Sequence, residues 1–439
     1  MTTPQQRALT AHRKGLRAAN DGRPGAGARW IRSGLAELGW RERDAAVPEA
    51  DRALVARLLM SLAHLESEQG RAEYGLGLLD HAERTVSAAD RGHLLAQRGL
   101  VLLRIGRWRE SLAQFTGAEP LLDTDREMLA RVLVNRGVLH LNRGDVRLAE
   151  RDLRRGADIA ARVGNELYAA MATHNVGYCE LLRGDISAAL HLLNVAASVY
   201  RRLAPGNMPI LETDRARALL AAGLATDAAA ELDGAITAFR RQRNDQYCAE
   251  AELSRAQAAL ATGDLRVAQR WAAAAVRRFR ARGNDAWTAL AELTRLRARP
   301  RSARVAAEAA QLAERLDAHG LRADAALANL LAARALIAVR RRDEAAHRLA
   351  AAGTGRTLPL DVALVRRLTR AELEILGGRH SAGLAELRAG LAMLHTHRGR
   401  LGSLDLQTGA SALGAELADA GLRLVLDRGS ARQVFAWLE

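Results

Sequence analysis

The stretch NRGVLHLNRGDVRLAERDLRRG, residues 135–156, decides the fold of this chain. Gly144 stands at its centre and Asp145 follows, with small residues at Gly137, seven positions before, and Ala149, five positions after. Glycine ends a helix in the left-handed conformation without a steric penalty, and aspartate favours the start of the next helix. The stretch therefore predicts two antiparallel helices joined by a tight turn, which cross closely because the side chains between them are small.

The same turn recurs along the chain. Candidate turn glycines stand at Gly70, Gly106, Gly144, Gly184, Gly223, Gly263 and Gly378, and the first six are separated by 36, 38, 40, 39 and 40 residues. The 115 residues between the last two leave room for two further units. We expect these units to turn near Pro300 and near Arg340, with a bend or a shortened helix at the proline.

Four positions around each turn repeat together. The small residues seven before the turn are Ala63, Gly99, Gly137, Gly177, Ala216, Ala256, Ala333 and Ala371. Those five after are Gly75, Ser111, Ala149, Ala189, Ala228, Ala268, Ala345 and Gly383. Twelve after stand Ala82, Ala118, Gly156, Ala196, Ala235, Ala275, Ala352 and Gly390. The apolar residues nine after are Leu79, Phe115, Leu153, Leu193, Leu232, Ala272, Leu349 and Leu387. Small residues allow a close helix crossing, and the large apolar residue fills the space beside it.

This pattern resembles the tetratricopeptide (TPR) family, although the usual repeat has about 34 residues and these units are longer. The resemblance implies an all-α fold, a right-handed superhelical TPR-like solenoid of antiparallel helix hairpins. Composition agrees, because alanine and leucine dominate a chain with only 3% aromatic residues. We expect the extra length in the helices or in loops such as residues 163–166 and 282–285.

Three regions follow from the pattern. Residues 1–45 form an N-terminal helical hairpin, or cap, with its turn at residues 22–27. Residues 46–400 carry the repeats of about 36–40 residues. Residues 401–439 contain one long helix over 403–427 and the truncated start of a following helix.

The net charge of +15 invites a nucleic-acid partner, but Lys14 is the only lysine and the arginines are spread along the whole chain. This distribution makes nucleic acid an unlikely partner, while the positive field favours acidic proteins or peptides. No apolar run is long enough for a membrane helix, and two cysteines form no disulfide framework. We expect a cytoplasmic protein with no membrane association.

No catalytic constellation, metal motif or cofactor motif is found. His174 and Cys179 are five residues apart on one expected helix, so they face different directions and form no nucleophilic pair. The glycines at residues 22–27 and 353–355 lack the lysine and hydroxyl residue of a phosphate-binding loop, and we interpret them as linkers. The sequence thus predicts a chain that is not an enzyme and uses no cofactor.

A row of polar residues suggests a binding surface instead. Nine positions before the turns stand Ser61, Gln97, Asn135, Asn175, Asp214, Ser254 and Thr369, and three residues further on stand Leu100, Val138, Tyr178 and Arg217. In TPR geometry this row resembles the positions of the first helix that line the concave groove. The candidate peptide-groove residues are Gln97, Asn135, Asn175, Tyr178, Asp214, Arg217 and Ser254. The alternative is that these groups are solvated or bond to a neighbouring helix.

The C-terminal stretch carries a second resemblance. Residues 397–409 (HRGRLGSLDLQTG), 421–426 (GLRLVL) and 434–439 (VFAWLE) look like the end of the helical region of bacterial CHAT-domain proteins, in which a TPR array precedes a caspase-like cysteine peptidase. The resemblance implies a protein-interaction scaffold, the regulatory or substrate-recruiting arm of such a protease, with the catalytic domain absent from this chain. The apolar final residues lead us to expect that the natural chain continues past Glu439.

Two other functions remain open. Transcriptional regulators also use helical repeats of about 40 residues as sensors, and a helix-turn-helix unit on either flank would favour that reading. A free-standing TPR adaptor is the other alternative.

Overall fold

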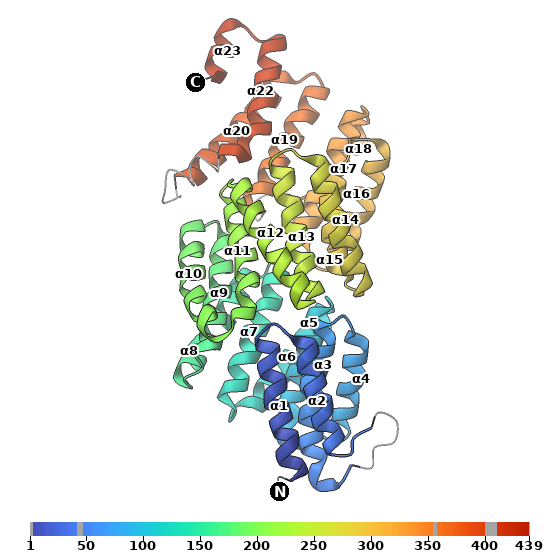
Figure 1. Cartoon of the computed structure of the whole chain (residues 1–439). Coiled ribbons are helices and arrows are strands. Elements are labelled where there is room, and N and C mark those ends of the chain that lie inside the picture. The colour runs from blue at the N-terminus through green and yellow to red at the C-terminus, as the bar shows by residue number, and fades with distance from the viewer. Residues whose placement is uncertain (1–2, 42–46, 354–357, 400–410, 439) are drawn as a thin grey trace.

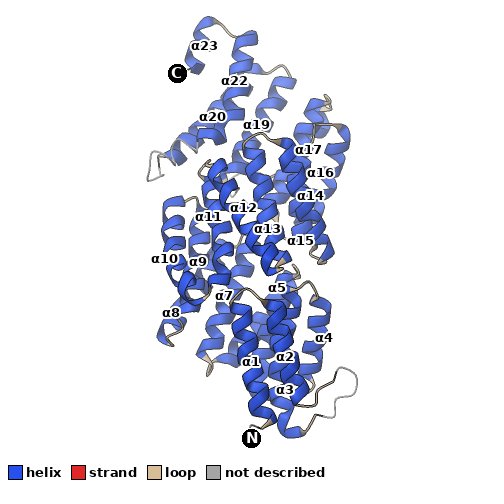
Figure 2. Ribbon diagram, in the orientation of Figure 1, coloured by secondary structure: helices blue, strands red, loops and turns tan. Residues whose placement is uncertain are grey.

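The computed structural model describes residues 3–41, 47–353, 358–399 and 411–438, and throughout these ranges the chain forms helices and turns without a strand (Figure 2). The helices pack as antiparallel pairs that stack into a right-handed superhelix. The two termini lie at opposite ends of an elongated molecule (Figure 1). This confirms the all-α solenoid predicted from the repeat.

In the part of the chain that the structure describes, nine helix pairs form the body of the solenoid. We call the first helix of each pair its A helix. The A helices are α3 Arg52–Glu68, α5 Arg91–Arg104, α7 Arg126–Asn142, α9 Glu166–Arg183, α11 Met208–Ala221, α13 Asp245–Ala261, α15 Asp285–Arg297, α17 Arg322–Ala338 and α19 Leu360–Leu376. We call the second helix of each pair its B helix. In the same order, the B helices are α4 Ala72–Glu83, α6 Trp108–Ala118, α8 Val146–Arg162, α10 Ile186–Leu203, α12 Ala225–Gln242, α14 Leu265–Ala281, α16 Ala303–Ala318, α18 Arg342–Ala351 and α20 His380–Arg398. The flanking helices are α1 Pro4–Asn20, α2 Pro24–Glu37, α22 Ala415–Arg428 and α23 Ala431–Leu438. Short 3₁₀ turns are η1 Glu49–Asp51, η2 Ala88–Asp90, η3 Glu119–Leu122, η4 Pro205–Asn207 and η5 Ala412–Gly414.

The turns within the pairs lie where the sequence predicts them. All seven turn glycines have positive φ, from 76° at Gly106 to 86° at Gly70. The two degenerate units turn at residues 298–302 and at Arg340, which itself adopts φ 59°. Because a side chain is strained in this left-handed region, glycine is the favoured residue in the other turns.

The small residues make the close contacts between the two helices of a pair. A Cβ atom added at Gly137 would lie only 2.6 Å from Leu153 Cγ, and one at Gly75 would lie 2.7 Å from the carbonyl oxygen of Ala63. Ser111 at the equivalent position donates a hydrogen bond of 2.7 Å to the carbonyl of Gly99. The four predicted registers are therefore the interface between the A and B helices.

The N-terminal hairpin has a tighter turn than expected. Pro24 is the first residue of α2, so the turn spans residues 21–23, and Gly27 lies inside the helix rather than in a linker. A Cβ atom at Gly27 would come within 2.7 Å of the carbonyl oxygen of Gly15. The glycine serves close helix packing, a role that its neighbours in sequence conceal.

The C-terminal region also differs from the expectation. Within the helix predicted over 403–427, residues 403–410 lie outside the described residues, the 3₁₀ turn η5 follows Ser411, and α22 begins at Ala415. Helix α23 folds back on α22, and Trp437 Nε1 donates a 3.1 Å hydrogen bond to the carbonyl of Ala418. Phe435 remains 64% exposed.

The unit at Pro300 is irregular, as the proline predicts. Helix α15 has 13 residues, whereas α13 and α17 have 17 each. Helix α16 packs more extensively on α17 than on its own partner α15. The fixed φ of proline and its missing N–H explain why the chain leaves the helix before Pro300.

Candidate functional site: the polar inner face

The structure separates the predicted row of polar residues into two groups. Gln97, Asn135 and Asn175 on α5, α7 and α9 are partly exposed and do not bond to one another. Asp214 and Ser254 on α11 and α13 are 9% and 1% exposed. The row thus changes from partly open in its first half to closed in its second.

Arg217 joins the buried group. Its guanidinium donates to Asp214 Oδ1 at 2.7 Å and to Ser254 Oγ at 3.0 Å. It also lies 5.9 Å from the ring centre of Tyr178 on α9. Three of the seven candidate residues therefore surround the guanidinium of a fourth, Arg217, and all four sit on A helices.

The side chains at the two ends of the row make hydrogen bonds within the protein. Ser61 Oγ bonds to His12 Nε2 of α1 at 2.9 Å. Thr369 is fully buried and donates to the carbonyl of Val365 in its own helix. Only the middle of the row is available to a ligand.

Charged residues outside the row meet the same cluster. We call the inner cluster the set Glu68, Arg104, Tyr178, Asp214, Arg217, Tyr247 and Glu250, which share electrostatic contacts across α3, α5, α9, α11 and α13. The Arg104 guanidinium lies 4.9 Å from the ring centre of Tyr247. Because α5 and α13 are four pairs apart, these side chains meet across the inside of the superhelix.

Burial shapes the ionisation of the inner cluster. It raises the pKa of Tyr247 to about 12 and raises the pKa of Glu250, while Arg217 and Arg104 oppose the latter effect. Burial alone would also raise the pKa of Asp214, but Arg217 and His174 hold that pKa below its ordinary value. His174 contributes a 2.9 Å hydrogen bond from Nε2. The cluster therefore holds a paired carboxylate beside phenol groups that stay neutral.

Several polar side-chain atoms on α3 and α5 have no hydrogen-bond partner among the described residues. They include His64 Nδ1, Gln97 Oε1 and Arg104 Nε, all shielded from solvent. A buried polar group without a partner costs about 1–3 kcal/mol. The side chain of Asn135 makes no hydrogen bond within the described residues. Asn175 Nδ2 donates to the carbonyl of Met171 at 2.7 Å, and the side-chain oxygen stays free. Of these groups, the partly exposed side chain of Asn135 and the oxygen of Asn175 can bond to a ligand without breaking internal contacts.

Helical spacing in the sequence could have identified Glu68, Arg104 and Glu250, which the row of polar residues does not include. Glu68 and Arg104 stand seven residues after Ser61 and Gln97, and Glu250 stands four before Ser254. Residues four or seven apart share one face of a helix. Extending the row by one or two helical turns would have found them.

The two thiols are buried and unreactive in character. Burial raises the pKa of Cys179 to about 12 and that of Cys248 to about 11. His174, the histidine nearest to Cys179 in sequence, bonds to Asp214 and Tyr200 instead. In the described ranges no three His, Cys, Asp or Glu side chains are grouped so as to hold a metal ion. A search of the same ranges for a helix that could cross a membrane finds none.

Comparison with known proteins supports the fold. No protein-family model matches the sequence, and no curated protein matches it. Among solved structures, a Rap protein complexed with competence and sporulation factor matches with a TM-score of 0.58 and 12% identity, over 83% of this chain and 99% of that one.

Two other solved structures are similar at lower scores. A tetratricopeptide repeat protein from Parabacteroides merdae has 18% identity and a TM-score of 0.38, over 66% of this chain and 99% of that one. The Rap conjugation gene regulator of plasmid pLS20, in complex with the Phr* peptide, has 12% identity and a TM-score of 0.41, over 68% of this chain and 95% of that one. At such identities the likeness concerns the fold, and the chain is a TPR-like helical solenoid.

Proposed function

We propose that this chain is a protein-interaction scaffold that binds a peptide or an extended protein segment against the inner face of its superhelix. The observation that carries the proposal is the pair of partly exposed amides on α7 and α9: the Asn135 side chain makes no hydrogen bond within the described residues, and Asn175 keeps its oxygen free. An extended peptide offers N–H and C=O groups at regular intervals, which suits amides spaced along successive A helices.

The chemistry of the proposed partner follows from the charges. The net charge of +15 favours an acidic partner by long-range attraction. The Rap protein of similar fold is itself complexed with competence and sporulation factor. We propose the cytoplasm as the place of action, because the thiols of Cys179 and Cys248 are buried and unpaired.

The finer proposal is that the scaffold is the regulatory or substrate-recruiting arm of a CHAT-type caspase-like protease. The resemblance of residues 397–439 to such proteins supports it. A sensor region of a transcriptional regulator and a free-standing adaptor are the alternatives. Reading the gene on both sides of this stretch separates them, since a caspase-like domain, a helix-turn-helix unit or neither will be encoded there.

The binding proposal is tested by selecting peptides from a display library on the purified chain and measuring their affinity by calorimetry. The double variant Asn135→Ala/Asn175→Ala should weaken binding about tenfold or more, because two hydrogen bonds of about 1 kcal/mol each are lost. Asn194→Ala, an exposed position on α10, is the matched control. Selected peptides that bind equally to all three proteins would contradict the proposal.

A further inference from the structure

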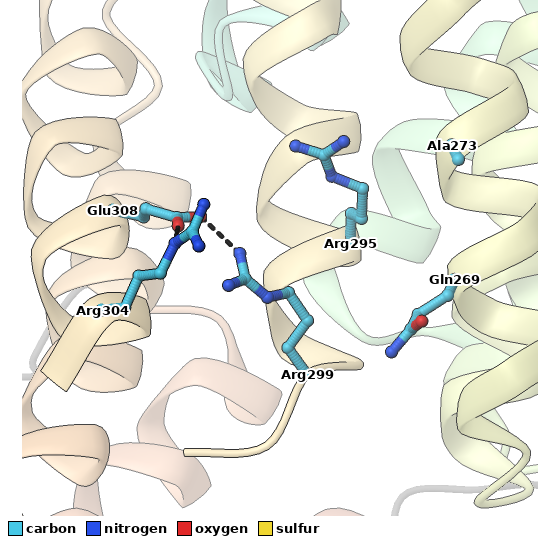
Figure 3. A pocket seen from close by; sticks show the side chains of 6 residues that line it. All are labelled: Gln269, Ala273, Arg295, Arg299, Arg304 and Glu308. Carbon is cyan, nitrogen blue, oxygen red and sulfur yellow. Dashed lines mark hydrogen bonds and ion pairs between the residues drawn. The ribbon is translucent and has the colours of Figure 1, made fainter. Parts of the chain in front are cut away.

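The irregular unit at Pro300 opens a basic crevice on the side of the solenoid. The crevice has a volume of about 420 Å³ and is lined by Gln269, Ala273, Arg295, Arg299, Arg304 and Glu308 (Figure 3). These residues come from α14, from the end of α15 and the turn that follows, and from the first turns of α16. The crevice exists because α15 and α16 diverge where the other pairs pack closely.

The lining carries more positive than negative charge. Arg299 and Arg304 both bond to Glu308, with Arg304 Nε at 2.8 Å from Glu308 Oε1. Hydrogen bonds from these two arginines hold the pKa of Glu308 below its ordinary value, so this carboxylate is charged at neutral pH. Three arginines against one glutamate leave a surplus of two positive charges.

Arg295 is the cation without a partner. Within the described residues its guanidinium makes no hydrogen bond and no salt bridge, although it stands beside the crevice (Figure 3). Glu292, three residues before it, is already bound by Arg280 at 2.9 Å and by Arg315 at 2.7 Å. Arg295, in the last turn of α15, and Arg299, in the turn that follows, are like charges that line the same crevice and repel each other. An anion between them would relieve this repulsion.

We infer that the crevice binds the phosphate group of a small phosphorylated molecule. A phosphate monoester carries about −1.5 to −2 charges at pH 7, which matches the surplus of the lining. Guanidinium groups bind phosphate oxygens through two parallel hydrogen bonds, and such charge-assisted bonds are about twice as strong as neutral ones. A carboxylate would neutralise only half of the surplus.

The rest of the lining indicates what carries the phosphate. The crevice is larger than a phosphate ion, and its volume lies within the usual range for small-molecule sites, about 300–1,000 Å³. Among the described residues, Ala273 is the only apolar side chain that lines it, and no aromatic ring does. Gln269 donates to the carbonyl of Ala298 at 2.7 Å and keeps its own oxygen as an acceptor for a hydroxyl group. The ligand class is therefore a phosphorylated sugar or polyol rather than a nucleotide.

Calorimetry of the whole chain with three probes tests this inference. The probes are inorganic phosphate, glucose 6-phosphate and AMP, at constant ionic strength. We expect glucose 6-phosphate to bind more tightly than phosphate and AMP, and Arg295→Ala to weaken its binding about tenfold or more. Arg295→Lys keeps the charge but not the two parallel N–H donors, so it should give an intermediate loss of affinity.

Arg277→Ala provides the matched control, because Arg277 is an exposed arginine on α14 outside the crevice. The Arg277→Ala variant should bind glucose 6-phosphate with an affinity within about twofold of that of the unsubstituted chain, since distant surface charges are screened by salt. Equal losses from Arg277→Ala and Arg295→Ala, or no binding of any probe at about 10 mM, would overturn the site. Tighter binding of AMP than of glucose 6-phosphate would overturn the assigned ligand class. Peptide binding to the inner face is independent of these results.

Discussion

Arg282 binds the end of a helix that lies more than two hundred residues away from it in sequence. Its Nη2 donates to the carbonyl oxygen of Ser67 at 2.6 Å and its Nη1 to that of Glu68 at 3.2 Å, and these are the last two residues of α3. The final carbonyls of a helix have no partner within it, and a cation is favourable there. In the same loop, Asn284 Nδ2 donates at 3.1 Å to the carbonyl of Arg104, the last residue of α5. The loop before α15 thus binds the C-terminal ends of α3 and α5, and so links the first two helix pairs to the seventh.

Arg282→Ala should lower the free energy of unfolding by about 2–3 kcal/mol, because it removes two charge-assisted hydrogen bonds and leaves buried carbonyls without a partner. Urea denaturation followed by circular dichroism measures the change. Arg277→Ala, at an exposed site, should change stability by less than about 0.5 kcal/mol. A similar small change for both variants would show that the loop does not hold the pairs together.

The glycine at the crossing of α7 and α8 should not accept a side chain. Gly137→Ala places a Cβ atom 2.6 Å from Leu153 Cγ and should destabilise the protein by about 1–3 kcal/mol. Gly77→Ala in α4 is the matched control, since a Cβ atom there meets nothing within 4 Å. It should stabilise the protein by about 0.5–1 kcal/mol, because alanine favours helix. Thermal unfolding of both variants checks the sign, and a stabilising Gly137→Ala would refute the close crossing.

Asp324 should make stability depend on pH. Burial, and then the neighbouring Asp361, raise the pKa of this carboxyl group from 3.8 to about 6. The folded state therefore holds the proton more tightly than the unfolded chain, so this contribution to stability is complete below about pH 4 and is lost as pH rises to about 6. Asp324→Asn should stabilise the protein by about 2 kcal/mol at pH 8 and change little at pH 4. Denaturation at the two pH values measures this, and an equal effect at both would disprove the raised pKa.

The thiols should react only after unfolding. Cys179 is fully buried and its pKa is raised to about 12, so very little thiolate exists at pH 8. Treating the native protein with Ellman's reagent should release little colour within minutes, and urea should expose both Cys179 and Cys248. Rapid reaction of one thiol in the native protein would contradict the burial of that cysteine.

The repeat was predictable because each hairpin is a local structure. A turn glycine such as Gly144, a small residue such as Gly137 and a large one such as Leu153 lie within about 20 residues of one another, so their spacing expresses the contact directly. The irregular unit was predictable too, since Pro300 cannot continue a helix. The tight turn before Pro24 was not, because glycines such as Gly27 serve both linkers and close helix crossings.

The candidate site was only partly predictable. The row that contains Asn135 and Asn175 follows from repeat register, and its use by a ligand remains a prediction. The convergence of Glu68, Arg104 and Glu250 depends on how far each pair rotates relative to the last, and small angles accumulate over several pairs.

The sequence by itself determined the helices, their turns and the interface within each pair, because these depend on residues close together along the chain. Only the tertiary structure decided that Arg282 caps α3, that charged residues meet inside the superhelix, and that Arg295 faces a crevice without a partner. The physical reason is that contacts between distant pairs depend on superhelical pitch. Pitch is the sum of many small packing angles, and no spacing of residues within one repeat specifies that sum.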